Sequence, residues 1–353
     1  MSFDISVLRD ALVAAAEFYR KEGRCLPWRR DHDAYHVFLS EIMLQQTRVE
    51  AVIPYYEKFL SLYPTVFDLA KAEETALFKA WEGLGYYSRA RNLKRAAERV
   101  VAEYQGVFPA DFDALLTLPG VGKYTAGAIA SIAYGIPRSA LDGNALRIYT
   151  RLFADDTSIS DESFKRQVTA RLDEAYPRDM AADVTQGLME VGQRFCIPVG
   201  APNCEGCPLR ALCAVGAGAD YRRYPVKEKK KPRRIEARTV LLLTDGEHIY
   251  LSRRAETGLL AGLWEFPNTE GHLSEADALT HALSLGITPQ GIAEGPEGKH
   301  IFTHIEWHMK SYLISVSRAE GTRLTPASPA ELTDTYPIPS AFRTFLNFIG
   351  DMK

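Results

Sequence analysis

The sequence predicts two domains, an all-α domain followed by an α+β domain, and three observations carry that prediction. From residue 6 to about residue 192 the apolar residues mostly recur at helical spacing, as in AYHVFLSEIML, with Pro and Gly at the joins. A crowded group of cysteines and the basic segment PVKEKKKPRR come next. Beyond them, IEARTVLLLTDGEHIYLSRR is typical of two strands around an Asp-Gly turn, and HIFTHIEWHMKSYLISV is again typical of a strand.

The domain boundaries follow from these changes of pattern. We place a helical region at residues 1–224, a linker at 225–234 and the second domain at 235–353. The linker holds six basic residues, one acidic residue and two prolines, a composition that suits an exposed connection.

Composition and charge narrow the classes of function. The 353 residues are 46% hydrophobic and 25% charged, and they contain no long apolar run, so a membrane protein is not expected. The first apolar stretch is interrupted by Asp10 and Glu17 and indicates an amphipathic helix rather than a secretion signal, so we expect a cytoplasmic protein. Residues 1–234 hold 33 basic and 30 acidic residues against 9 and 15 in the remainder, which favours the first part for phosphate binding.

Four of the five cysteines crowd between Cys196 and Cys213 with the spacing C-x7-C-x2-C-x5-C, while Cys25 stands alone. In a protein expected inside the cell, such crowding favours metal ligation over disulfides. Four thiolates can hold either a zinc ion or a 4Fe-4S cluster, and the spacing alone leaves both open.

Residues 115–135, LLTLPGVGKYTAGAIASIAYG, predict a helix, a tight turn and a second helix. Gly120 and Gly122 would let the backbone approach a partner closely, and the amides that begin the second helix would form an anion site for a DNA phosphate. Lys123 adds a positive charge. The alternative is a plain helix-helix turn.

The LPGVGKYTA pattern resembles the helix-hairpin-helix of the DNA glycosylase superfamily. That resemblance implies an aspartate some twenty residues further on, and Asp142 stands there in SALDGNALRIYTRLF. Without the hairpin upstream, an Asp-Gly before a helix would be interpreted as a helix cap.

The resemblance also covers the cysteine loop, residues 196–213. The family pattern is C-x6-C-x2-C-x5-C directly after the helical domain, so the chain carries one extra residue, which we interpret as a loop insertion. It implies one 4Fe-4S cluster and no nucleotide cofactor. The implied ligands are Cys196, Cys204, Cys207 and Cys213.

Two further segments, CLPWRRDHDAYHVFLSEIMLQQTRVEAVIPYY and WEGLGYYSRARNL, closely resemble the adenine DNA glycosylases of the MutY type. The lyase relatives of this family carry a Schiff-base lysine where this chain has Tyr124. The resemblance therefore implies a monofunctional enzyme that removes adenine and leaves an abasic site.

Removal of adenine calls for an acid, because the base departs readily only when its five-membered ring is protonated. Glu41 lies in FLSEIML, whose apolar side chains can raise a carboxyl pKa toward neutrality. By resemblance Asp142 stabilises the oxocarbenium-like sugar, and Tyr124 and Asn144 line the same site. That Glu41 and Asp142, 101 residues apart, converge rests on the resemblance.

The resemblance assigns two further sets of residues. The adenine pocket corresponds to Arg24, Trp28, Arg29, Leu44, Val49 and Gln186. The residues that fill the vacated stack or contact the orphan base correspond to Gln46, Thr47, Leu84 and Tyr86.

The second domain resembles a Nudix fold through LLAGLWEFP. A Nudix hydrolase needs clustered glutamates for its metal ions, and ALTHALSLGI has Thr280, Leu283 and Ser284 instead, so hydrolysis is not expected. In the family this domain reads 8-oxoguanine through a Phe-Ser-His loop, which here is Phe302-Thr303-His304.

The expected partner is double-stranded DNA with adenine opposite 8-oxoguanine or guanine, bound by a monomer. Two alternatives remain. A bifunctional glycosylase/lyase for oxidised pyrimidines is disfavoured by Tyr124, and a non-enzymatic iron-sulfur module that binds DNA is disfavoured by the presence of both carboxylates.

Overall fold

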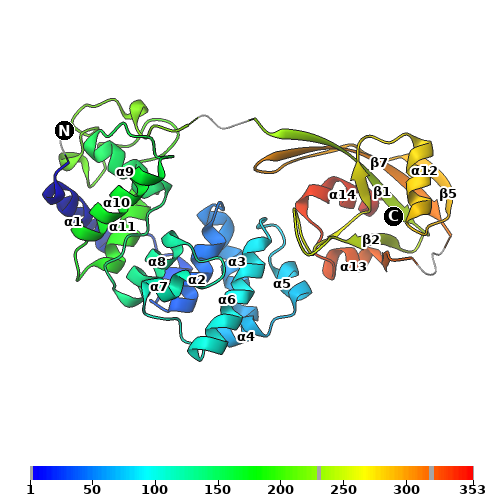
Figure 1. Ribbon diagram of the computed structural model, residues 1–353, viewed down its shortest axis with the longest axis horizontal. Helices are drawn as coiled ribbons and strands as arrows, with labels where there is room; N and C mark the ends of the chain where they lie inside the picture. The colour runs from blue at the N-terminus through cyan, green and yellow to red at the C-terminus, as the bar shows by residue number, and fades with distance from the viewer. Residues whose placement is uncertain (1–2, 229–231, 318–321, 353) are drawn as a thin grey trace. The chain divides into compact units, whose positions relative to one another are not determined.

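The computed structural model describes residues 3–228, 232–317 and 322–352 (Figure 1). Its contacts divide the chain into two compact units, one of Met1–Lys71 with Asn92–Lys229, the other of Ala72–Arg91 with Lys230–Lys353. Residues 229–231 of the predicted linker lie outside the described residues, and Arg234 already begins the first strand. No helix in the described part of the chain is long and apolar enough to span a membrane.

The first unit is all helical. Its helices are α1 (Ile5–Glu22), α2 (Ala34–Leu44), α3 (Val49–Leu62), α4 (Val66–Ala70), α6 (Ser88–Tyr104), α7 (Phe112–Leu116), α8 (Lys123–Tyr134), α9 (Gly143–Phe153), α10 (Glu162–Ala175) and α11 (Ala181–Arg194), with 3₁₀ turns at Pro27–Arg29, Arg210–Leu212 and Tyr221–Arg223. The start of α6 and the short helix α5 (Glu74–Ala80) fall among the residues grouped with the second unit.

Aspartates begin several of these helices. Asp4, Asp33, Asp142 and Asp161 each accept hydrogen bonds from backbone amides of the following turn. Such caps satisfy amides that have no partner within the helix, and each stabilises a helix by about 1 kcal/mol.

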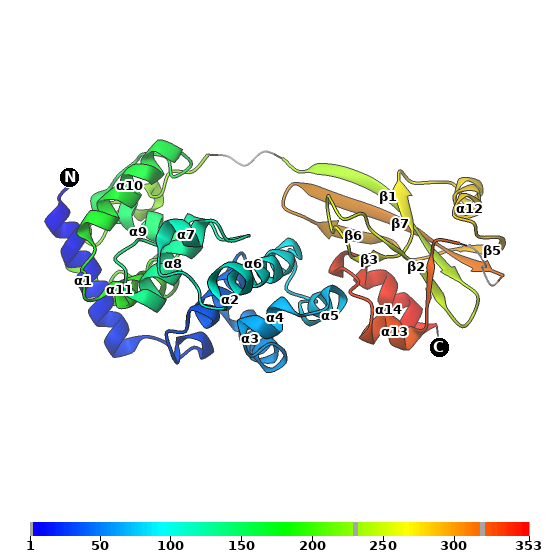
Figure 2. The ribbon, with the colours of Figure 1, turned by 60° about the horizontal axis from the view of Figure 1, so that its bottom comes forward.

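Two packing contacts organise the helical core. Helix α1 packs along α11, and the two share a core with α9 and α10 that includes Leu12, Tyr149 and Val184 (Figure 2). Helix α8 packs against both α2 and α11. At the α1–α11 contact a Cβ on Gly187 would lie 2.2 Å from the carbonyl oxygen of Ala15, so this close approach requires glycine.

The second unit is built on one mixed sheet. Its strands are β1 (Arg234–Thr244), β2 (Ile249–Arg253), β3 (Trp264–Glu265), β4 (Asn268–Glu270), β5 (Pro289–Glu294), β6 (Gly298–Ile301), β7 (Ile305–Val316) and β8 (Thr325–Ala327). The main order is β3-β2-β1-β7-β5, where β1 and β7 are parallel and the other pairs antiparallel. The predicted strands around the Asp245-Gly246 turn are confirmed as β1 and β2.

Helices cover both faces of this sheet (Figure 1). Helix α12 (Glu275–Ser284) packs on the face that carries Leu241 and Leu243. Helices α13 (Pro329–Asp334) and α14 (Arg343–Asp351) lie on the opposite face, where Phe342 and Phe345 join Val240 and Leu242. The predicted fold class, an all-α region followed by an α+β domain, is confirmed.

Candidate active site

Glu41 lies in the middle of α2 and is buried, with 4% of its surface exposed. One carboxylate oxygen accepts a hydrogen bond from the Tyr124 hydroxyl, and Oε2 has no hydrogen-bond partner among the described residues. Burial raises the pKa of Glu41 to about 7, with a contribution from the negative charge of Asp142, while Tyr124 and Arg29 act in the opposite direction. This carboxyl group can therefore hold a proton near neutral pH.

Tyr124 reaches Glu41 because it is the second residue of α8, which packs against α2. Burial raises the pKa of Tyr124 well above its usual value, and the carboxylates of Glu41 and Asp142 add to this effect. The phenol therefore stays protonated and acts as a hydrogen-bond donor to Glu41.

Asp142 is the N-cap of α9 and is held by three hydrogen bonds. Its Oδ1 accepts from the amides of Asn144 and Ala145 at 2.9 and 2.8 Å, and its Oδ2 accepts from the Asn144 side chain at 2.7 Å. Burial raises the pKa of Asp142, although these bonds and the nearby Arg147 guanidinium favour the ionised form. The helix N-terminus thus fixes the position of a potential anion.

Glu41, Tyr124, Asp142 and Asn144 all border one pocket of the first unit. The structure thereby brings together two carboxyl groups that stand 101 residues apart in the sequence. A neutral carboxylic acid can protonate a leaving group, and a second, ionised carboxylate beside it can stabilise a developing sugar cation.

A second cavity adjoins this pocket, and Glu41 borders both. All six residues predicted for the adenine pocket border the cavity, and they are Arg24, Trp28, Arg29, Leu44, Val49 and Gln186. The Trp28 ring is 6% exposed and packs edge-on against Tyr56, with 5.3 Å between ring centroids. The cavity therefore has one aromatic wall, a set of polar groups and the Glu41 carboxyl group.

Several residues that border the cavity were not predicted from the sequence, among them Met189 and Gln193. Glu190, which binds two residues of the cavity wall, was not predicted either. Glu190 is fully buried and binds Arg24 and Arg29. It follows the predicted pocket residue Gln186 by four positions on α11, so helical spacing was the signal that could have revealed it.

The predicted wedge residues Gln46 and Tyr86 share an unusual backbone conformation. Their φ angles are 58° and 50°, in the left-handed region that few residues other than glycine adopt, and both side chains are exposed. Thr47 borders the pocket of the two carboxylates. Leu84 is buried, with 7% of its surface exposed, so little of it is available for contact with a base in this conformation.

The residues of the predicted lesion loop lie together in the second unit. Phe302, Thr303 and His304 form the turn between β6 and β7 and border a pocket that Tyr86 of the same unit also borders. The hydroxyls of Tyr86 and Thr303 are 3.0 Å apart, within hydrogen-bonding distance.

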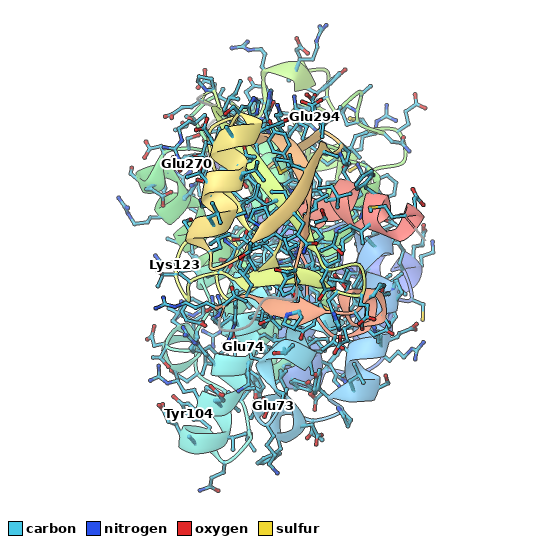
Figure 3. The ribbon with its side chains drawn as sticks, turned by 90° about the vertical axis from the view of Figure 1, so that its right-hand side faces the viewer. Glu73, Glu74, Tyr104, Lys123, Glu270 and Glu294 are labelled. Atoms are coloured by element: carbon cyan, nitrogen blue, oxygen red, sulfur yellow. The ribbon has the colours of Figure 1, made fainter. Side chains whose placement is uncertain are left out.

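The predicted phosphate site stands at the surface. Gly120 has a φ of 77°, and Gly122 precedes α8 without a side-chain cap, so the amides of the first helical turn remain available to a ligand. Lys123 is exposed, and its side chain lies near the margin of the view in Figure 3.

The four clustered cysteines border one hollow together with Phe195, Arg151 and Arg210. Among the described residues, no three His, Cys, Asp or Glu side chains are grouped as ligands for a metal ion. The thiols instead surround a hollow, and Arg151 Nη1 lies 3.3 Å from Cys196 Sγ. Four thiols around a hollow fit a cluster ligated by four cysteines.

The extra residue of the cysteine spacing falls in a loop that reaches into solvent. Val199 is 83% exposed and Gly200 has a φ of 81°, while the Asn203 amide bonds the Phe195 carbonyl at 3.0 Å and closes the base of the loop. The insertion therefore need not disturb the cysteines.

Comparison with known families finds two matches. Residues 39–174 match the HhH-GPD superfamily of base excision DNA repair proteins, and residues 239–348 match the NUDIX domain.

Curated relatives carry the name adenine DNA glycosylase. The human protein is 31% identical and the alignment covers 94% of this chain and 71% of the relative. The Buchnera aphidicola (Acyrthosiphon pisum) protein is 30% identical with 84% of both chains covered. The Arabidopsis thaliana protein is 34% identical over 87% of this chain, which spans 57% of that relative's length.

Among solved structures, a thermostable thymine-DNA glycosylase superposes with a TM-score of 0.54 at 28% identity and covers 60% of this chain and 97% of its own. A trapped endonuclease III–DNA covalent intermediate superposes with a TM-score of 0.51 at 24% identity, covering 61% of this chain and 98% of its own, and this likeness concerns the fold.

Proposed function

The chain belongs to the adenine DNA glycosylases of base excision repair, and from that premise we propose that it excises adenine paired with 8-oxoguanine or guanine in duplex DNA. The observation that carries the proposal is the pocket shared by Glu41 and Asp142, which adjoins the cavity of the predicted adenine residues. The enzyme would act on duplex DNA in the cytoplasm, associated with the nucleoid if its source is bacterial.

The reaction begins with a flipped adenine, because the glycosidic bond is out of reach within the stacked duplex. The base enters the cavity beside Trp28 and meets Glu41. With a pKa of about 7, the Glu41 carboxyl group can hold a proton near neutral pH and give it to a nitrogen of the five-membered ring. Adenine then departs as a neutral base.

Departure of the base leaves positive charge on the sugar. Asp142, held at the N-terminus of α9, supplies the opposing negative charge, and Asn144 keeps its carboxylate oriented through the 2.7 Å bond to Oδ2. Glu41, now ionised, takes a proton from the incoming water. Since Tyr124 offers no amine, no Schiff base forms and the product is an uncut strand with an abasic site.

Holding the flipped-out state requires filling the gap left in the stack. We assign Gln46 and Tyr86 to this task, since both are exposed residues with a constrained backbone. The amides and lysine at Gly120, Gly122 and Lys123 grip a phosphate.

The second unit reads the lesion rather than hydrolysing a nucleotide. Thr303 and His304 are exposed in the turn between β6 and β7, where they can meet the edge of 8-oxoguanine. On α12, the positions where a hydrolase would carry glutamates hold Thr280, Leu283 and Ser284. Thr303 keeps the hydroxyl of the family's serine and adds a methyl group, which changes the fit to the lesion.

Cys196, Cys204, Cys207 and Cys213 would hold one 4Fe-4S cluster in the hollow that they border. The cluster would organise the loop, since base hydrolysis transfers no electron. Iron analysis and charge-transfer absorbance of anaerobically prepared protein test this assignment. About four iron atoms per chain support it, and zinc alone would refute it.

The function is tested by single-turnover excision on duplexes with adenine opposite 8-oxoguanine or guanine. Wild type should release adenine, Glu41→Gln should be slower by about 10³-fold or more, and the exposed control Glu162→Gln should match wild type. If wild type leaves adenine in place, the proposal fails.

Two further outcomes separate the alternatives. A covalent adduct trapped by borohydride on DNA with oxidised pyrimidines would indicate a lyase. Tight binding to mispaired DNA without release of any base would indicate a binding module.

A further inference from the structure

A buried group of charged side chains lies behind the cavity that Trp28 and Arg29 border. Glu190 of α11 is fully buried, and its two carboxylate oxygens accept hydrogen bonds from Arg24 Nε at 2.9 and 3.0 Å. Arg29 Nη1 donates to the same carboxylate at 2.7 Å. The Arg194 guanidinium stands 3.7 Å away, one turn along α11.

This group connects the cavity wall to the helical core. Arg24 and Arg29 both border the cavity, whereas Glu190 does not. Arg29 is further fixed by its bond to the Arg24 carbonyl and by the Tyr19 ring, 5.3 Å from its guanidinium carbon. The Tyr19 hydroxyl in turn donates to the Gln186 side chain at 2.8 Å. Glu190 is thus the anion on which two cationic wall residues converge.

The charge of Arg29 matters because it opposes the role proposed for Glu41. Arg29 stabilises the ionised form of Glu41 and so lowers the pKa of that acid. A fully buried carboxylate bonded to Arg29 offsets this positive charge. Each carboxyl group has its own charged or titratable neighbours. Those near Glu190 are Arg24, Arg29 and Arg194, with Tyr19 and Cys25 beyond them. Those near Glu41 are Tyr124, Asp142 and Arg29.

We propose that Glu190 is a positioning residue for base excision, whose buried carboxylate holds Arg24 and Arg29 in the cavity wall and cancels their charge beside Glu41. It acts through the two arginines and touches neither base nor sugar. The inference rests on the proposed role of Glu41 as the proton donor.

The test is the pH profile of single-turnover adenine excision by the full chain with its cluster. In Glu190→Gln an acceptor oxygen remains but the negative charge is gone, so the Glu41 proton is lost at lower pH. The excision rate falls at high pH as Glu41 loses its proton, and we expect this basic limb of the pH profile to move down by roughly 0.5–1 pH unit. Excision should then be about 3–10-fold slower than wild type at pH 8 and within about twofold of wild type near pH 5.5. A parallel loss at every pH, with the limb unmoved, overturns the proposal.

Two companion variants separate charge from shape. Glu190→Asp keeps the charge and should leave the limb in place. Combining Glu190→Gln with Arg29→Gln removes the negative and the positive charge together. The basic limb of the pH profile should then return toward its wild-type position. A limb that stays displaced in the double variant also overturns the proposal.

The controls distinguish misfolding and failure of the underlying function. Circular dichroism, thermal midpoints and iron content establish that each variant is folded, and Glu162→Gln removes an exposed glutamate charge elsewhere. If Glu41→Gln retains full activity, the proposed function fails. If Glu41→Gln is inactive and Glu190→Gln shows only a parallel loss, the proposed function stands and the role of Glu190 falls.

Discussion

Replacing Glu41 by Gln should stabilise the folded protein and slow excision by about 10³-fold or more. The Glu41 carboxyl has a pKa of about 7 in the folded chain against an ordinary value of 4.5. Between these values the folded chain keeps a proton that the unfolded chain has lost, so the stability of the wild type falls as pH rises through this window. A glutamine carries no such proton and escapes the penalty.

The magnitude follows from the two pKa values. They differ by about 2.5, and at about 1.36 kcal/mol per pH unit the penalty reaches about 3 kcal/mol at pH 8. At pH 5 the folded group is protonated and only part of the unfolded population has ionised, so the penalty is about 0.8 kcal/mol. Glu41→Gln should therefore gain about 2–3 kcal/mol more stability over wild type at pH 8 than at pH 5.

Urea unfolding of both proteins at pH 5, 6, 7 and 8, followed by tryptophan fluorescence, measures this difference. Glu162→Gln is the matched control, because Glu162 is exposed and its pKa is lowered by the hydrogen bond from Lys165. A difference between Glu41→Gln and wild type that does not change from pH 5 to pH 8 would refute the electrostatic reasoning.

Three further predictions concern other helices of the first unit. Asp142→Asn keeps a capping side chain on α9 but removes the charge opposite the sugar cation, so single-turnover excision should fall by about 10²–10³-fold with stability within about 1 kcal/mol; near-normal excision would contradict the role. Tyr124→Phe removes a hydrogen bond that lowers the pKa of Glu41, so the basic limb of the excision profile should move to higher pH, and a limb at lower pH would show the sign to be wrong. Gly187→Ala places a Cβ 2.2 Å from a carbonyl oxygen of α1 and should cost about 1–3 kcal/mol in urea unfolding, whereas Gly350→Ala, with open space at its Cβ, should change little; equal effects would disprove the close contact.

The fold could be predicted because periodicity and turn residues act locally. Helical spacing, the Asp-Gly turn and the strand-like composition of β1 and β7 each depend on a few neighbouring residues. The grouping of Ala72–Arg91 with the second unit could not be predicted, because it depends on contacts between segments far apart in sequence. Arg234, the last residue that we assigned to the linker, pairs with Ile305 in β1.

The candidate site, like the fold, could be predicted from the sequence only in part. Local motifs identified Glu41 and Asp142, but their proximity depends on the packing of α8 against α2 and on the position of the α9 N-terminus. The role of Glu190 could not be predicted, because a glutamate on a helix is usually exposed. Its burial arises from two arginines more than 160 residues earlier in the chain.

The packing of α1 along α11 has a consequence for synthesis. The face of α1 that carries Leu8, Leu12 and Ala15 is covered largely by a helix that begins at Ala181. A ribosome adding 5–20 residues per second needs roughly 10–35 s to make the intervening chain. Helix α1 therefore leaves the ribosome well before the helix that covers it, and its apolar stripe lacks this covering helix for that interval.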